Sequence, residues 1–159
     1  MSGADTGAPG ARGHTRDAAP NERAHSAENV PRATSKSDLI LIAEDEKPIA
    51  EAMSFIVEDA GYTPMIATNG RQALELVRAH QPLLIITDLM MPHLDGTQLI
   101  KAIHADAELD GHAPPPILLM TAAGMKRAQE AGADAVMRKP FNIDELEATI
   151  HWLVEGRGK

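Results

Sequence analysis

The sequence contains no cysteine, and this absence removes several kinds of chemistry at once. Without thiols the chain forms no disulfide, offers no thiolate ligand for zinc and has no thiol nucleophile. Aromatic residues are also scarce, at 3% of the 159 residues. Because stacking on aromatic rings is a main way of holding nucleic-acid bases, the sequence offers no such platform. Any core must be packed from aliphatic residues and methionine.

Long apolar runs and an excess of positive charge are missing as well. The sequence has no stretch of about eighteen apolar residues and no basic start followed by an apolar secretion signal, so we expect a soluble cytoplasmic protein without a membrane segment. Residues 38–159 carry ten Lys and Arg against nineteen Asp and Glu. An acidic surface repels phosphate backbones, and we therefore expect no nucleic-acid partner.

Residues 1–37 have a composition unlike the rest of the chain. They hold four glycines and three prolines, and they lack isoleucine, leucine, phenylalanine, tryptophan and tyrosine. Such a segment cannot bury enough apolar surface to offset the entropy of ordering the chain, so we predict a disordered tail. Two interpretations stay open: a passive extension, such as one left by a misassigned start codon, or a targeting or regulatory tail.

From residue 38 onward, short apolar runs alternate with segments of helical periodicity, a pattern typical of a parallel sheet covered by helices. The runs are expected to be strands buried on both faces, and they span residues 39–43, 65–67, 83–87, 117–120 and 135–137. A helix is expected after each run. Right-handed crossovers then give an α/β protein with a doubly wound (βα)5 parallel sheet in the order 2-1-3-4-5.

The expected helices have recognisable ends. Pro48 suits an opening position and Gly61 a stop for the first helix, Asn69 begins the second, and Asn142 caps the fifth. The fourth helix is short, from about residue 124 to 131. Inward stripes are expected in the first helix from Ile49, Ala52, Met53, Ile56 and Ala60, and in the fifth from Ile143, Leu146, Ile150 and Leu153.

Polar groups follow the strands on the side where a doubly wound sheet binds its ligands. They are three carboxylates, a hydroxyl and an ammonium, from Glu44, Asp45, Asp88, Thr121 and Lys139. Crowded carboxylates repel unless a cation shares the site, and oxygen ligands suit Mg²⁺. A carboxylate beside Mg²⁺ can attack phosphorus to give an acyl phosphate. Asp88 is then the nucleophile, Asp45 and Glu44 bind the metal, Lys139 neutralises charge, and Thr121 donates a hydrogen bond.

Each of these residues has a simpler explanation when it is taken alone. An acidic residue at a strand end is usually a solvated loop residue or a helix cap, Thr121 alone suits a cap of the next helix, and Lys139 alone suits the surface. The coincidence of suitable groups at four strand ends favours a functional site, because a purely structural explanation does not predict it.

Five motifs in the same order resemble the receiver domain of two-component response regulators. They are the stretches 41–46, 87–96, 120–122, 132–134 and 139–141, which read LIAEDE, TDLMMPHLDG, MTA, GAD and KPF. The resemblance covers residues 38 to about 155 and implies the flavodoxin-like form of the fold. It implies that Asp88 accepts the phosphoryl group and that Asp45, Asp88 and the backbone carbonyl of Met90 bind Mg²⁺.

The same resemblance implies roles for the remaining site residues. Glu44 stands where the family has an acidic residue that acts mostly through water. Thr121 would hydrogen-bond the phosphoryl group and Lys139 would pair with it, and the Lys139–Pro140 peptide would be cis. The family docks its phosphodonor near the first helix, where Phe55 lies off the expected inward stripe.

By this resemblance we expect a single-domain receiver of the chemotaxis-regulator kind in residues 38–156. Because the sequence ends at Lys159, just after the fifth helix, no output domain is expected. A sensor histidine kinase or a histidine phosphotransfer protein would supply the phosphoryl group. The signal would leave by contact with an unknown downstream protein or by phosphorelay. The domain would catalyse only its own phosphorylation and dephosphorylation, and we do not expect an enzyme with a separate substrate.

Two other classes of function use similar residues. A Mg²⁺-dependent phosphatase also works through an aspartyl phosphate, but it needs a second Asp two residues after the nucleophile, where this sequence has Met90. A receiver-like module that binds partners without phosphorylation is the third class, and the complete set of site residues argues against it.

The sequence departs from the resemblance in its fourth helix. Many receivers place an aromatic residue three positions before the lysine, and here that residue is Val136. Thr121 and Lys139 are eighteen positions apart, about one helical turn less than the family suggests. We therefore expect phosphorylation to change the order of residues 122–134 rather than to rotate an aromatic ring.

Overall fold

The computed structural model describes residues 38–156, so the tail expected for residues 1–37 lies outside the described part of the chain. A parallel five-stranded sheet of order β2-β1-β3-β4-β5 forms the centre. A helix follows each strand. The elements are β1 (Leu39–Ala43), α2 (Lys47–Asp59), β2 (Thr63–Ala67), α3 (Gly70–His80), β3 (Leu84–Asp88), α4 (Gly96–Asp110), β4 (Ile117–Thr121), α5 (Met125–Gln129), β5 (Ala135–Arg138) and α6 (Ile143–Gly156).

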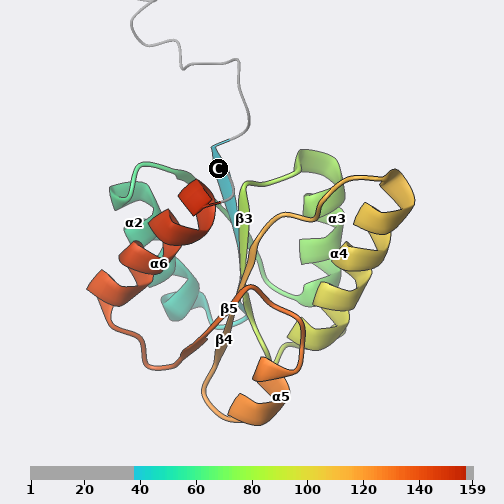
Figure 1. The fold of residues 1–159 in the computed structure, drawn as a ribbon. Coiled ribbons are helices and arrows are strands. Elements are labelled where there is room, and N and C mark those ends of the chain that lie inside the picture. The colour runs from blue at the N-terminus through green and yellow to red at the C-terminus, as the bar shows by residue number, and fades with distance from the viewer. Residues whose placement is uncertain (1–37, 157–159) are drawn as a thin grey trace, which may run out of the picture. The chain divides into compact units, whose positions relative to one another are not determined.

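The predicted doubly wound topology is confirmed. Helices α2 and α6 cover one face of the sheet and α3 and α4 the other, while the short α5 lies at the end of the sheet where the strands stop (Figure 1). The sheet order reverses between β1 and β3, which pair directly. In the part of the chain that the structure describes, no helix is long and apolar enough to cross a membrane.

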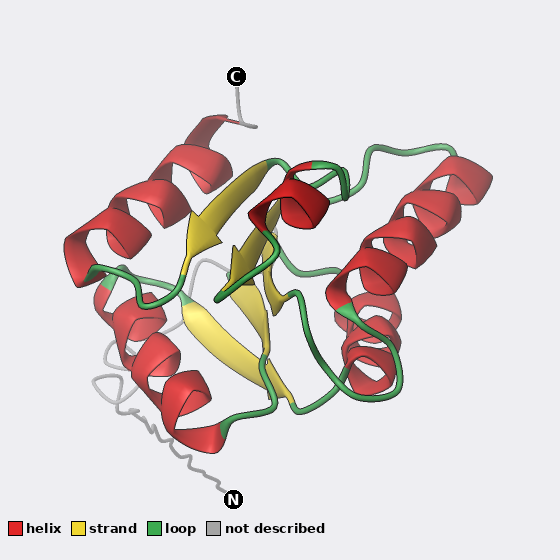
Figure 2. Ribbon diagram, turned by 90° about the horizontal axis from the view of Figure 1, so that it is seen from below, coloured by secondary structure: helices red, strands yellow, loops and turns green. Residues whose placement is uncertain are grey.

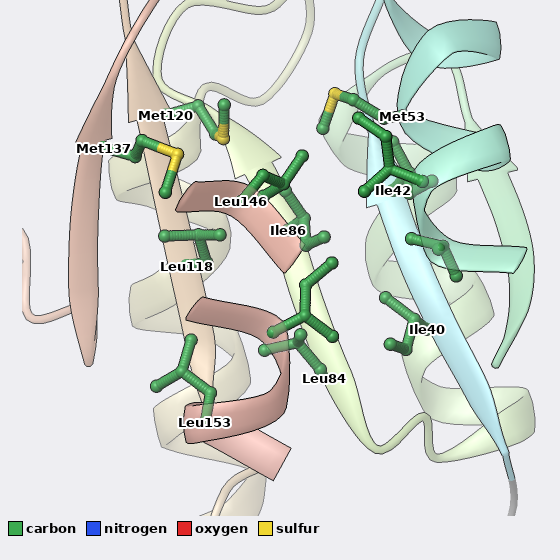
Figure 3. Packing of buried hydrophobic residues seen from close by; sticks show 13 residues of the cluster. Ile40, Ile42, Met53, Leu84, Ile86, Leu118, Met120, Met137, Leu146 and Leu153 are labelled. Atoms are coloured by element: carbon green, nitrogen blue, oxygen red, sulfur yellow. The ribbon is translucent and has the colours of Figure 1, made fainter. Parts of the chain in front are cut away.

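Two apolar clusters, one on each face, hold the helices to the sheet. Alternate residues of one strand serve different faces: Ile40 and Ile42 of β1 pack toward α2 and α6, and Leu41 packs toward α3 and α4. Figure 3 shows the first cluster, in which Leu146 and Leu153 of α6 lie against the sheet. Because both faces are covered, the strands are almost entirely apolar, as the sequence predicts for a parallel sheet.

The helix ends follow local sequence signals. The Oδ1 atom of Asn69 accepts a hydrogen bond from the backbone N–H of Gln72 over 2.8 Å, and that of Asn142 accepts one from Glu145 over 3.1 Å. These side chains satisfy backbone donors that a helix leaves free in its first turn. Gly61, just beyond α2, has a φ of +100°, which only glycine adopts easily.

Some details differ from the sequence-based predictions. Ala52 is exposed, because the buried face of α2 is formed by Ala50, Met53, Ile56 and Val57 instead. Ile143 is 62% exposed, since it is the first residue of α6 and precedes the turn at which Leu146 reaches the sheet. β2 begins at Thr63, earlier than expected, because it pairs with β1 along its whole length. The short fourth helix is confirmed by the five residues of α5.

Gly96 lets α4 pack closely against the end of β3, where Asp88 lies. It is buried at the first position of α4, and its N–H donates to the carbonyl of Leu89 over 2.8 Å. A Cβ atom at this position would lie 2.5 Å from the carbonyl oxygen of Asp88 and 2.9 Å from Cα of Leu89. Only a residue without a side chain lets α4 approach this backbone so closely.

We expect Gly96→Ala to lower the free energy of unfolding by about 1–3 kcal/mol, because the added methyl group meets backbone atoms that cannot move aside cheaply. Thermal or urea denaturation measures the change. Gly156→Ala is the matched control, since nothing lies within 4 Å of the added methyl group there. Its effect should stay within about 0.5 kcal/mol. Equal stability of the two variants would contradict the close approach.

Candidate functional site

The predicted site residues meet at one edge of the sheet. Glu44 and Asp45 follow β1, Asp88 ends β3, Thr121 ends β4, and Lys139 follows β5. The strands are parallel and in register, so these ends lie side by side, as in the partner pairs Ala43 with Thr87, Asp88 with Met120 and Thr121 with Arg138. Figure 2 views the molecule from this side, with α5 close to the sheet.

Glu44, Asp45 and Asp88 form a compact acidic cluster. One carboxylate oxygen from each lies within 4.8 Å of the others. Glu44 is buried, Asp88 is half-buried and Asp45 is exposed, so the cluster opens toward solvent on one side. Negative charges this close repel strongly, and a bound dication relieves the repulsion. The hard oxygen donors and the open side fit Mg²⁺, which keeps several of its own waters.

Lys139 places a positive charge beside two of these carboxylates, those of Glu44 and Asp88. Its Nζ atom lies 2.9 Å from Oε1 of Glu44 and 3.4 Å from Oδ2 of Asp88, and its side chain is only 11% exposed. Burial works against the charged form, but the hydrogen bond to Glu44 and the charges of Asp88 and Glu44 outweigh it and raise the pKa of Lys139. The ammonium therefore stays protonated at neutral pH.

Asp88 has a pKa well above the usual range of a carboxylate. Burial, followed by the charge of Glu44, raises the pKa of Asp88 to about 6, although Lys139 and the N–H of Leu89 act in the opposite direction. Its Oδ1 accepts the Leu89 N–H over 3.0 Å, and its Oδ2 faces Lys139. At neutral pH the group is mostly ionised and more basic than an ordinary carboxylate.

Glu44 does more in this structure than the sequence suggests. Its Oε1 binds the ammonium of Lys139, and its Oε2 accepts the backbone N–H of Glu46 over 3.1 Å. Glu44 therefore anchors Lys139 directly, in addition to bordering the metal position. No pattern in the sequence indicates this contact, because the two residues are 95 positions apart.

Thr121 lies at the same edge but is turned to the backbone. It is buried, its hydroxyl donates to the carbonyl of Ala123, and its Oγ1 accepts the Ala123 N–H over 3.2 Å. The cap position of α5 belongs to Gly124, so the simpler explanation of Thr121 as a helix cap is wrong. To donate a hydrogen bond to a phosphoryl group on Asp88, the hydroxyl of Thr121 would have to give up its hydrogen bond to the carbonyl of Ala123.

The loop between β3 and α4 completes the surroundings of Asp88. Met90 lies two residues after Asp88, and it is 62% exposed. The N–H of Leu89 also donates to the carbonyl of Met120 over 2.9 Å, which fastens the start of the loop to β4. The peptide between Lys139 and Pro140 is cis, as the resemblance implied.

Comparison with known proteins agrees with this geometry. The family model described as the response regulator receiver domain matches residues 40–151. Over 120 residues the chain is 33% identical to response regulator Rre1 of Synechocystis sp., which covers 72% of this chain and 51% of that protein. The chain therefore spans about half the length of that curated relative.

Solved structures give the same result. The signal receiver domain of a signal transduction histidine kinase from Syntrophus aciditrophicus is 32% identical, with a TM-score of 0.67 over 74% of this chain and 90% of that one. The receiver domain of Saccharomyces cerevisiae Ssk1, solved with the histidine phosphotransfer protein Ypd1, has a TM-score of 0.71 over 78% and 92% of the two chains. At 24% identity, this second match shows the fold alone. The chain thus belongs to the response regulator receiver domain family of two-component signalling, a family of phosphoacceptor domains.

Proposed function

We propose that Asp88 accepts a phosphoryl group from a phosphohistidine in a Mg²⁺-dependent reaction. The observation that carries the proposal is that Asp88 lies 3.4 Å from the ammonium of Lys139 and in one cluster with the carboxylates of Glu44 and Asp45. The raised pKa of Asp88, about 6, adds to this, because a more basic carboxylate is a better nucleophile while it is still ionised at neutral pH.

The proposed reaction joins a carboxylate oxygen of Asp88 to phosphorus and breaks the bond between phosphorus and the imidazole nitrogen. The bonding electrons leave with the imidazole ring, which departs neutral when its other nitrogen carries a proton. Asp45, Asp88 and the backbone carbonyl of Met90 would hold Mg²⁺, which would neutralise charge on the phosphoryl oxygens. Lys139 would pair with the phosphoryl group, and Thr121 would donate a hydrogen bond to it.

Residues 38–156 are the proposed receiver unit, because they supply every group that this reaction requires. The donor would be a sensor histidine kinase or a histidine phosphotransfer protein, a class of partner with which the Ssk1 receiver was solved. The signal would then leave by contact with a downstream protein or by phosphorelay. Met90 stands where an aspartyl-phosphate phosphatase needs its second Asp, which argues against that alternative.

Asp88→Asn should abolish phosphoryl uptake, because an amide is not a competent nucleophile and is a weaker metal ligand. Incubation with acetyl phosphate and Mg²⁺, followed by intact mass measurement, should show one added phosphoryl group on the wild type and none on the variant. Asp106→Asn is the control, because it removes a carboxylate that pairs with Arg78 on the surface. Labelling of Asp88→Asn would place the acceptor elsewhere.

Mg²⁺ affinity should fall in acid, because a proton on Asp88 competes with the metal. With the pKa of Asp88 at about 6, the apparent affinity should weaken about tenfold between pH 7 and pH 5 and change little above pH 7. Calorimetric titration with MgCl₂ measures this dependence. Asp88→Asn should show weaker binding and a flatter pH profile. The same wild-type affinity at pH 5 and pH 7 would argue that Asp88 does not bind the metal.

Phe55→Ala should slow phosphoryl transfer from a partner protein severalfold and leave transfer from acetyl phosphate unchanged. Phe55 is 70% exposed on α2, where an apolar side chain can contribute to a protein contact but not to the chemistry. Trp152→Ala is the matched control, since Trp152 is 64% exposed in the last turns of α6, far along that helix from its start beside the site. Equal slowing with both donors would rule out a docking role for Phe55.

A further inference from the structure

One arginine fastens the short helix α5 to the loop that follows Asp88. The Nη2 atom of Arg127 donates to Oδ2 of Asp95 over 2.7 Å, and Nη1 lies 3.8 Å from the sulfur of Met90. Met90 is near the start of the loop between β3 and α4, and Asp95 is its last residue. A single guanidinium therefore contacts this loop near both of its ends.

The carboxylate that Arg127 binds is itself held firmly. Oδ1 of Asp95 accepts the N–H of Gln98 over 2.9 Å, and the N–H of Asp95 donates to Oε1 of Gln98 over 2.9 Å. This reciprocal pair caps the N-terminus of α4, where the helix dipole also favours negative charge. Asp95 is 23% exposed, and its second oxygen remains for Arg127. Arg127 thus ties α5 to a fixed point of the fold.

The helix α5 has few stabilising features of its own. It has five residues, its cap position is Gly124 in a left-handed conformation, and no side chain caps its first turn. Ala128 is the one residue of this helix that is buried. A helix of this length does not form without tertiary contacts, so the position of α5 depends on its packing against β4 and β5, where Ala128 is buried, and on the contacts of Arg127.

We propose that Arg127 is a positioning residue for Mg²⁺ binding. Through Asp95 and Met90 it would hold the loop in the conformation that offers the backbone carbonyl of Met90 as a ligand. The proposal rests on the proposed function, because that function makes the Met90 carbonyl a metal ligand. Coupling between two sites is reciprocal, so a metal that binds better when Arg127 holds the loop must also stabilise α5.

The direction in which Mg²⁺ affinity changes when Arg127 is replaced distinguishes a positioning role from the effect of its charge alone. Arg127 carries a positive charge near an acidic metal site, so its removal by charge alone would strengthen the binding of Mg²⁺. Loss of positioning has the opposite sign, because a freed loop presents the Met90 carbonyl less often. A weaker metal affinity after removal of a cation therefore has no electrostatic explanation.

The test is calorimetric titration of Arg127→Gln with MgCl₂ at pH 7.5. We expect the dissociation constant to rise about three- to fivefold, the range that one partly exposed ion pair supports. Amide exchange of residues 122–131 should be faster in the variant, and Mg²⁺ should protect these amides less than in the wild type. With acetyl phosphate, the Mg²⁺ concentration for half-maximal phosphorylation should rise while the rate at saturating Mg²⁺ stays unchanged.

Two further variants test whether the effect is specific to the contact between Arg127 and Asp95. Arg78→Gln removes the ion pair to Asp106, which has the same chemistry, joins α3 to α4 at 2.6 Å and is similarly exposed. It should leave Mg²⁺ affinity unchanged. Asp95→Asn keeps a good helix cap but loses the charge that Arg127 binds. Adding Arg127→Gln to Asp95→Asn should weaken Mg²⁺ binding less than Arg127→Gln weakens it in the wild type, because the contact with Asp95 is already lost and only that with Met90 remains.

The possible results of these titrations either overturn or support the positioning role of Arg127. Wild-type Mg²⁺ affinity in Arg127→Gln, tighter binding in that variant, or equal weakening in Arg127→Gln and Arg78→Gln would each overturn the positioning role. Failure of the proposed function is seen separately, in a wild-type protein that neither binds Mg²⁺ nor takes a phosphoryl group from acetyl phosphate. Weakening confined to variants of the contact between Arg127 and Asp95 supports the proposal.

Discussion

The crowding of three carboxylates at one end of the sheet is the constraint on which the local structure depends. One carboxylate oxygen each of Glu44, Asp45 and Asp88 lies within 4.8 Å of the others, and such proximity costs free energy unless positive charge compensates it. Lys139 offsets part of this cost, with a side chain that is only 11% exposed. Burial, and after it the charge of Glu44, raises the pKa of Asp88, so the surroundings of this carboxylate make it more basic.

The sheet brings these carboxylates together and keeps the strand ends that carry them from moving apart. Parallel pairing in register brings the ends of β1, β3 and β4 together, and two apolar clusters prevent the strands from sliding apart. Gly96 brings α4 against the backbone of Asp88 and Leu89, which limits the movement of that strand end further. The strand ends therefore cannot separate without disturbing the core, and a bound cation would reduce the repulsion between the carboxylates that lie there.

The sequence predicts the elements that depend on local pattern. Apolar runs locate the strands, and Asn69 and Asn142 mark helix starts, because a cap needs only a side chain and the next three residues. The five polar site residues are found by the rule that ligands bind at the carboxyl ends of strands. The predicted inward positions of Ala52 and Ile143 are wrong, because the orientation of a helix on a sheet depends on how it packs as a whole.

Long-range side-chain pairs are beyond prediction from one sequence. The contact of Lys139 with Glu44 and that of Arg127 with Asp95 join residues 95 and 32 positions apart, and neither spacing carries a signal. Both depend on side-chain rotamers that are set by the tertiary packing around them. The geometry of Thr121, turned to Ala123, is of the same kind, since a hydroxyl selects its partner from whatever backbone lies near.

The location of the single tryptophan has a practical consequence for spectroscopy. Trp152 is 64% exposed near the end of α6, so its indole is already largely in water in the folded protein. Its emission maximum and its quenching by iodide should resemble those of a free indole, whether or not an ion occupies the acidic edge. Intrinsic fluorescence is thus a poor reporter for this protein, and a tryptophan introduced on the loop after β3 would give the optical signal that the natural sequence lacks.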